Sequence, residues 1–182
     1  MRFIKKLYIY PLYNYTSDSD LWDVALIHLN KPVKYTMYTS PICIDETDLF
    51  FKESRCTASG WGSLEQAEDS PGSNVPHSVI LTIMTQENCN ITVSNFEPSF
   101  SIQPPLVCAI GEDQDGNGII QDVCWGDSGG PLMCEVSGRW YQVGIVASGN
   151  VCGTPGYPGL YSRVTFYKYW IKHTMASGET NG

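Results

Sequence analysis

The stretch Cys124-Trp-Gly-Asp-Ser-Gly-Gly-Pro-Leu-Met-Cys134 sets one serine, Ser128, among glycines and beside an acid, with a cysteine at each end. Glycines let the backbone turn tightly and leave amide N–H groups free to point at a substrate oxygen. Donors aimed at a developing oxyanion are often the largest contribution to catalysis. A Gly/Ser-rich turn between two strands is the alternative interpretation, but the unbroken run Gly126–Pro131 between two cysteines favours a nucleophile. A serine hydroxyl needs a base to take its proton.

Three histidines are available as that base, and we expect none of them to act. His28 lies in an alternating apolar and polar stretch typical of a strand, so it is interpreted as a structural or surface residue. His77 follows Pro76 in a turn-rich segment, and His173 falls in a predicted terminal helix. The sequence therefore contains a nucleophile motif without an evident partner.

Composition indicates a packed globular chain with an acidic balance. The 182 residues are 42% hydrophobic and 16% charged, which excludes a disordered chain. Nineteen Asp and Glu against eleven Lys and Arg give a net charge of −8, which disfavours nucleic acid and anionic membrane as partners. No apolar run reaches the length of a membrane span, and residues 1–13 are interpreted as a strand rather than a signal segment. No cofactor is predicted.

Seven cysteines and two glycosylation sequons, Asn14-Tyr15-Thr16 and Asn90-Ile91-Thr92, point to an oxidising secretory compartment. We therefore expect an extracellular or cell-surface protein with Asn14 and Asn90 as glycan acceptors. Seven is an odd number, so one thiol either pairs outside this chain or stays free.

Short apolar runs separated by turn residues predict an all-β chain with one helix at its end. The terminal helix is predicted over Phe166–Met175, and a surface loop over Glu65–Pro76. The predicted strands are Phe3–Tyr10, Val24–Leu29, Thr57–Gly60, Val79–Thr85, Pro105–Cys108, Pro131–Cys134, Tyr141–Val146 and Gly159–Val164.

The acidic segment Asp113–Gly118 imitates the first half of an EF-hand calcium loop. Its sixth position is Gly118, as such loops require, but the twelfth would be Cys124 instead of the bidentate Glu. A solvated acidic loop is the preferred interpretation, and no metal site is predicted.

Several motifs outside the serine stretch are similar to those of trypsin-like serine proteases of the chymotrypsin family. The resemblance covers nearly the whole chain and rests on Asp23-Val-Ala-Leu26, Pro41-Ile-Cys43, Ala58-Ser-Gly-Trp-Gly62, Tyr161-Ser-Arg-Val164 and Trp170-Ile171, together with the serine motif. It implies a double β-barrel fold and proteolysis by acyl transfer, with proteins or peptides as substrates and protease inhibitors as further partners.

The resemblance also assigns catalytic roles by position. Ser128 would be the nucleophile, and the backbone N–H groups of Gly126 and Ser128 would form the oxyanion hole. Asp23 would be the triad acid that orients the catalytic histidine and stabilises its cation. Asp127 would be buried on activation and neutralised by a newly cut chain terminus, which implies a zymogen.

The specificity pocket follows from the same alignment. Asp122, six residues before Ser128, would form the pocket floor and favour Arg or Lys before the cleaved bond. Gly149 and Gly159 would form pocket walls that leave room for a long cation. A solvated loop acid is the alternative interpretation of Asp122.

The family pairing implies three disulfides and leaves Cys43 for a bond to a segment before the activation cut, that is, to a disulfide-linked N-terminal chain. A buried free thiol is the alternative for Cys43. The implied pairs are Cys56–Cys134, Cys89–Cys108 and Cys124–Cys152.

The sequence departs from the family pattern in two ways. The histidine motif and the cut N-terminal sequence are absent, so we expect a fragment that lacks most of the first barrel, has little activity alone, and exposes apolar strand edges over Phe3–Leu29. Around the site, Ala147 and Ser148 stand where Ser and Trp are usual, Val123 lines the pocket, and Trp125 puts a bulky ring at its mouth. These differences keep open a non-catalytic homologue that acts as a binding module.

The predicted organisation has four parts. Residues 1–45 are a remnant of the first barrel, 46–55 an interdomain linker, 56–165 the second barrel with the nucleophile, and 166–182 the C-terminal helix and tail. The predicted function is that of a serine endopeptidase that cleaves after Arg or Lys.

Overall fold

The structure is a computed structural model that describes residues 1–16, 21–44, 46–47, 53–67, 69–149 and 151–179. Parts of the predicted linker 46–55 and of the C-terminal tail lie outside the described residues. The elements in chain order are β1 (Ile4–Ile9), β2 (Ala25–Leu29), β3 (Cys43–Ile44), β4 (Arg55–Gly60), β5 (His77–Ile83), α1 (Gln86–Ser94), β6 (Leu106–Gly111), β7 (Pro131–Val136), β8 (Arg139–Ser148), β9 (Gly159–Arg163) and α2 (Val164–Glu179).

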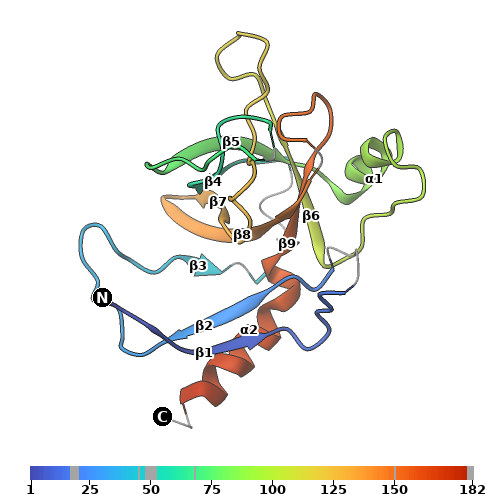
Figure 1. The fold of residues 1–182 in the computed structure, drawn as a ribbon. Helices are drawn as coiled ribbons and strands as arrows, with labels where there is room; N and C mark the ends of the chain where they lie inside the picture. The colour runs from blue at the N-terminus through green and yellow to red at the C-terminus, as the bar shows by residue number, and fades with distance from the viewer. Residues whose placement is uncertain (17–20, 45, 48–52, 68, 150, 180–182) are drawn as a thin grey trace.

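Six strands form a closed barrel in the upper part of Figure 1. Their order is β8-β7-β4-β5-β6-β9, and an additional β8–β9 pairing closes the ring. The strands alternate inward and outward residues, so the apolar inward ones meet at the centre. Ala58, Leu81, Leu132, Val146 and Tyr161 form part of this core and are all buried. The barrel and the terminal helix confirm the predicted fold class.

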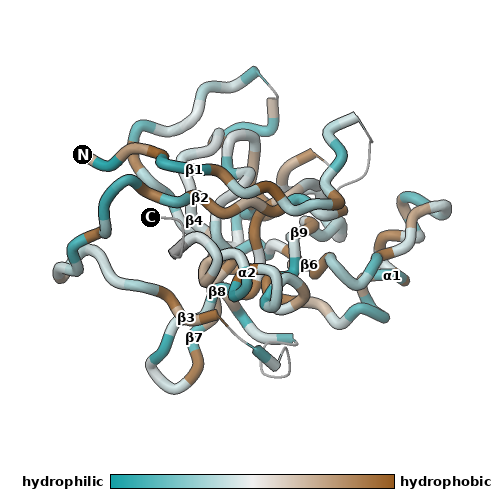
Figure 2. The backbone as a smooth tube through the Cα atoms, turned by 90° about the horizontal axis from the view of Figure 1, so that it is seen from below, coloured by the Kyte–Doolittle hydropathy of each residue, from teal (hydrophilic) through white to brown (hydrophobic). Residues whose placement is uncertain are grey.

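A separate two-stranded sheet, β1–β2, lies below the barrel and against α2. Tyr8 pairs with Leu26 and Leu7 pairs with Ile27, so these two pairs point to opposite faces of the sheet. Leu26 packs in a cluster with α2, whereas Leu7, Ile9 and Ile27 are exposed on the other face. In Figure 2 the two strands carry long apolar stretches along the outside of the molecule. In the described residues β1 and β2 pair with no further strand, and the exposure of apolar strand edges stays a prediction.

Aromatic side chains fasten the segment before β2 to α2. The Tyr10 ring stacks on Trp22 with centroids 5.7 Å apart and meets Tyr167 edge-on at 5.0 Å. Trp22 has a φ of 67°, in the left-handed region that bulky residues rarely adopt. This packing holds the strained residue directly before Asp23.

The helix α2 is longer than the predicted Phe166–Met175. Tyr167 and Ile171 are buried, as the predicted apolar face requires, but Phe166 is exposed. No helix in the described ranges combines the length and the apolar character needed to cross a bilayer.

Two elements were not predicted. Thr85, placed in a strand by its sequence, is instead the N-cap of α1, where its hydroxyl accepts the Asn88 N–H at 3.1 Å. The helix is rich in β-branched and Asn residues, which are poor helix formers, and it is held by buried Cys89 and Val93. The two-residue β3, which pairs in parallel with β8, is too short for a sequence pattern.

Candidate active site

Ser128 lies on a tight turn that leads from the Cys124 disulfide into β7. Gly126 and Gly129 have φ values of 93° and 81°, which side-chain-bearing residues rarely adopt. The Gly129 N–H donates to the Val146 carbonyl at 2.8 Å, and the Gly130 N–H donates to the Asp127 carbonyl at 2.8 Å. These bonds fix the turn against β8 and leave Ser128 exposed.

The two N–H groups predicted to bind an oxyanion are not used inside the protein. Among the described residues, no acceptor takes a hydrogen bond from the backbone N–H of Gly126 or Ser128. The neighbouring Asp127 N–H, by contrast, donates to the Cys124 carbonyl at 3.0 Å. The turn therefore offers two free donors beside an exposed hydroxyl, which an oxyanion site requires.

A cavity of about 160 Å³ opens beside this turn. Its lining includes Ser128, Asp122, Trp125, Gly149 and Gly159, so the structure brings these predicted residues together. A side chain on Gly149 would approach the Gly159 Cα at 3.8 Å, and one on Gly159 would press on the Tyr161 ring at 3.1 Å. The two glycines thus keep the cavity open.

Asp122 supplies the negative charge of this cavity. Its carboxylate accepts the Val123 N–H at 2.8 Å and, at a longer 3.4 Å, the Gly153 N–H. Burial raises the pKa of Asp122 to about 6, and the two backbone hydrogen bonds oppose this shift only in part. No described Lys or Arg pairs with this carboxylate. The cavity is therefore suited to an incoming cation.

Tyr161 is a site residue that the sequence reasoning did not identify. Its hydroxyl is buried, and no partner for it is found among the described residues. Burial raises the pKa of Tyr161 well above its usual value, and the charges of Asp122 and Asp127 raise it further. Tyr161 itself lines neither cavity, but a Cβ built on Gly159, which does line the smaller one, would come within 3.1 Å of the Tyr161 hydroxyl. The sequence gives no sign that Tyr161 lies near the site. Only the three-dimensional structure shows its buried hydroxyl without a partner in the described part of the chain.

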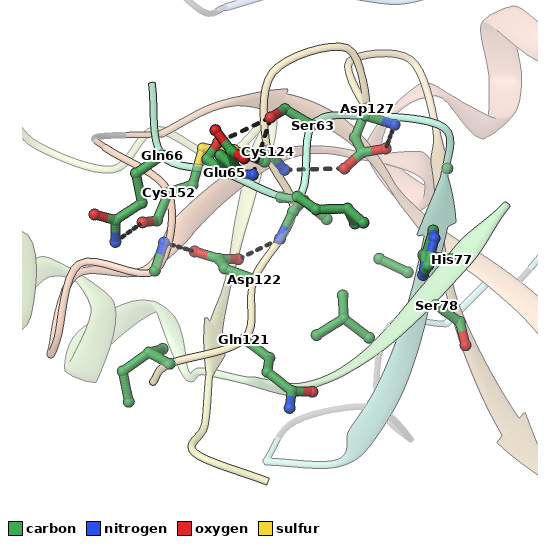
Figure 3. Close-up of a pocket in the computed structure, with 18 of the residues that line it drawn as sticks. Ser63, Glu65, Gln66, His77, Ser78, Gln121, Asp122, Cys124, Asp127 and Cys152 are labelled. Atoms are coloured by element: carbon green, nitrogen blue, oxygen red, sulfur yellow. Dashed lines mark hydrogen bonds between the residues drawn. A yellow bond between two sulfur atoms is a disulfide. The ribbon is translucent and has the colours of Figure 1, made fainter. Parts of the chain in front are cut away.

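Asp127 lines a second, larger cavity of about 510 Å³, drawn in Figure 3. Its carboxylate accepts the Gly62 N–H at 2.8 Å and the Cys124 N–H at 2.9 Å. A Cβ on Gly60 or Gly62 would clash with this carboxylate, so both glycines form its cradle. Asp122 also lines this second cavity, which places one carboxylate between the two spaces.

Asp23 lies on a different element from the cavity residues. Its carbonyl accepts the Ser162 hydroxyl at 2.7 Å, which ties the start of β2 to β9. The side chain is exposed, and Asp23 lines neither of the two cavities. Its predicted part in a triad remains a prediction.

None of the three histidines, all of which lie in described segments, is hydrogen-bonded to Ser128. His77 lines the larger cavity and bonds the Ser73 hydroxyl at 3.1 Å. His28 lines a groove between β2 and α2, and His173 is exposed on α2.

Comparison with known proteins matches the Trypsin family model to residues 2–171. The chain belongs to the trypsin family. It is 35% identical to human testisin over 175 residues, which is 96% of this chain and 53% of testisin. It is 36% identical to human serine protease 41 over 157 residues, 85% of this chain and 48% of that protein. The chain thus spans about half the length of these relatives.

The disulfides agree with those implied by membership of the trypsin family. The described residues form Cys56–Cys134, Cys89–Cys108 and Cys124–Cys152. Two of them anchor the site, because Cys124 and Cys134 flank the Ser128 turn. Cys43 is a free thiol, and it is exposed rather than buried, which excludes the buried alternative.

The calcium-like segment is an acidic loop held by its own backbone. Asp113 accepts the N–H groups of Gly118 and Gly116, both at 2.7 Å, and of Asn117 at 3.1 Å. These bonds lower the pKa of Asp113 below its usual value, and the bond from Gly118 has the largest effect. Both carboxylate oxygens of Asp113 therefore take part in forming the loop.

Proposed function

We propose that this chain supplies the nucleophile and the primary specificity pocket of a serine endopeptidase that cleaves after Arg or Lys. The observation that carries the proposal is the shared cavity: the exposed Ser128 and the uncompensated Asp122 line the same space. An Arg or Lys side chain bound at Asp122 would bring the carbonyl of that same residue toward Ser128.

The chemistry would be acyl transfer. The Ser128 hydroxyl attacks the carbonyl carbon, and the N–H groups of Gly126 and Ser128 bind the oxyanion. The C–N bond then breaks, the amine leaves with a proton, and water hydrolyses the acyl-serine. Asp23 would orient the base, a histidine that none of His28, His77 and His173 provides.

Several further properties belong to this proposal. Asp127, at the larger cavity, would bind a newly formed chain terminus on activation of a zymogen, with Gly60 and Gly62 as its cradle. Cys43 would bond to an N-terminal chain, and its exposure supports such a bond. We further propose an extracellular or cell-surface location, glycans on Asn14 and Asn90, and protease inhibitors as binding partners.

A fluorophosphonate probe that labels activated serines tests the catalytic part. Without a base at Ser128 we expect this chain to label far below one probe per molecule, because loss of any triad member leaves only residual catalysis. The Ser128→Ala variant sets the background. Stoichiometric labelling that is lost in the Ser128→Ala variant would contradict the proposed inactivity of the chain alone.

Binding of benzamidine, a small aromatic cation, tests the pocket separately. We expect saturable binding that weakens by about 30-fold or more in Asp122→Asn, because removal of one member of a buried charge pair costs about 2–5 kcal/mol. Equal binding by Asp122→Asn would contradict the proposed Arg/Lys specificity without affecting the role of Ser128.

The second candidate function is a non-catalytic binding module of the same family. Ala147 and Ser148 in the cavity lining, where Ser and Trp are usual in the family, favour it. The same two measurements separate the candidates. Benzamidine binding without serine labelling, in this chain and in any longer form of the protein, would support the binding module.

A further inference from the structure

The charges of this acidic chain are strongly segregated. Residues 1–16 and 24–44 contain five of its eleven basic residues and none of its nineteen acidic ones. The remaining sequence therefore contains six basic residues and all of the acidic ones. The net charge of −8 conceals one basic region, which we name the basic end and which consists of Arg2, Lys5, Lys6, Lys31 and Lys34.

Hydrogen bonds join the two halves of the basic end in space. The Arg2 guanidinium donates to the Pro32 carbonyl at 2.9 Å. The Phe3 N–H donates to Asn30 Oδ1 at 3.0 Å, and the Asn30 N–H donates to the Phe3 carbonyl at 2.9 Å. Figures 1 and 2 both place the N-terminus beside the β2–β3 connection. The start of β1 and residues 30–34 thus form one surface.

All five cations of the basic end are exposed, and none forms an ion pair within the described part of the chain. The segment that connects β1 to β2 contains Asp18, Asp20 and Asp23. Of these, Asp23 lies beyond the opposite end of β1, which at about 3.4 Å per residue is about 25 Å from Arg2. Surface charges are screened beyond about 8 Å at physiological salt. Asp23 therefore does not cancel the positive potential around Arg2.

Exposed aromatic rings lie next to these cations. Residues 36–39 form a tight turn in which Thr36 and Thr39 exchange N–H bonds of 2.9 and 3.2 Å. The turn holds Tyr38 88% exposed, and the adjacent Tyr35 is 72% exposed. Rings of this kind offer flat faces against which the C–H groups of a sugar can pack.

The cellular compartment of the protein indicates which kind of polyanion could be its ligand. Three disulfides indicate an oxidising, secretory environment. Nucleic acid is not a resident of that environment, and anionic lipid is concentrated in the cytoplasmic leaflet. Basic clusters of this kind also bind heparin-like chains. We propose that the basic end binds a sulfated polysaccharide, with Arg2, Lys31 and Lys34 pairing with sulfates and Tyr35 and Tyr38 contacting sugar rings.

Titration calorimetry of the whole chain with heparin tests this proposal. The test variant is Lys31→Gln/Lys34→Gln, and the control is Arg55→Gln/Arg139→Gln, which removes the same charge from exposed positions on the barrel. By analogy with phosphate contacts, we expect the test variant to bind about 10-fold more weakly at ~0.1 M salt and to lose about two from the slope of log K against log salt. The control should stay within about 2-fold.

Three outcomes would overturn the proposal. The first is no binding of heparin at low salt, and the second is an equal loss in both double variants, which would indicate attraction without a site. The third is equally tight binding of desulfated heparin, duplex DNA or phosphatidylserine vesicles, which would assign the surface to another ligand class. None of these measurements involves Ser128, so the proposed proteolytic function stands or fails independently.

Discussion

Gly62 donates its backbone N–H to Asp127 Oδ1 at 2.8 Å, across 65 positions of sequence. A Cβ on Gly60 would collide with the same carboxylate. Gly60 and Gly62 therefore form a cradle around Asp127 that only glycine can form. The carboxylate and the two glycines belong to separate strand ends, so the cradle joins β4 to the turn that presents Ser128.

Replacement of Gly60 by Ala should displace the Asp127 carboxylate. We expect the free energy of unfolding to fall by about 3 kcal/mol, because overpacking costs about 1–3 kcal/mol and hydrogen bonds to a charged group contribute about 1.5–3 kcal/mol. Denaturant unfolding measures the loss. Gly149→Ala is the matched control, since its Cβ would meet nothing closer than 3.8 Å.

A double-mutant cycle separates this clash from a general effect at Gly60. The Asp127→Ala variant lacks the carboxylate that a Cβ on Gly60 would hit. In that background, Gly60→Ala should therefore lower the free energy of unfolding by less than it does in the native chain. Additive losses would show that Gly60 is needed for some reason other than Asp127.

Asp122 should make the fold less stable as the pH rises. Its pKa in the folded chain is about 6, against an ordinary pKa of 3.8 for an aspartate, so the folded state binds the proton more tightly than the unfolded state does. Stability attributable to Asp122 is therefore lost as the pH rises from about 4 to about 6. Relative to the native chain, Asp122→Asn should gain up to about 3 kcal/mol at pH ~7 and nothing at pH ~3.5.

Asp113→Asn provides a control of opposite sign. The pKa of Asp113 is lowered in the folded state, so its carboxylate stabilises the fold above the unfolded pKa, and that contribution is lost as the pH falls through the folded pKa. Thermal unfolding measured from acidic to neutral pH should therefore show that Asp113→Asn is less stable than the native chain at neutral pH, and that this difference shrinks as the pH falls. A gain for Asp122→Asn that does not vary with pH would contradict the titration of Asp122.

Much of the fold followed from the sequence because its motifs are local. The Ser128 turn lies in a short stretch whose residue types favour its geometry, whereas Asp122, Gly149 and Gly159 were assigned through the resemblance to a known family. Other features arise only when distant segments meet. Helix α1 has little helical propensity and depends on Thr85 and on the Cys89–Cys108 bond. The roles of Gly60 and Tyr161 likewise depend on neighbours far away in the chain.

Cys43 should be the one cysteine that reacts without denaturation. It is exposed, whereas the other six cysteines form the three disulfides. We expect iodoacetamide to add once per chain under native, non-reducing conditions, as measured by intact mass. Cys43→Ser should remove that addition. Alkylation of the Cys43→Ser variant would mean that one of the three disulfides is not formed in solution.

Replacement of an apolar residue by Thr should affect stability differently on the two sides of the β1–β2 hairpin. Ile27 is 58% exposed on the face away from α2, whereas Val24, three residues earlier, is 6% exposed and packs against Tyr167 and Ile171. Together with Leu7, its cross-strand partner, Ile27 gives this sheet an uncovered apolar face. Such faces promote association between chains. We therefore expect the isolated chain to self-associate, and Leu7→Thr/Ile27→Thr to reduce this association with little change in melting temperature.

Val24→Thr is the internal control, because it places a hydroxyl of similar size in a buried position. It should lower the free energy of unfolding by about 1–3 kcal/mol, since the hydroxyl loses water without gaining a designed partner. Sedimentation velocity over a range of concentrations measures association, and thermal unfolding measures stability. A native chain that stays monomeric at every concentration would show that the exposed face is not adhesive. A large loss of stability in Leu7→Thr/Ile27→Thr would show instead that the face is covered within the chain.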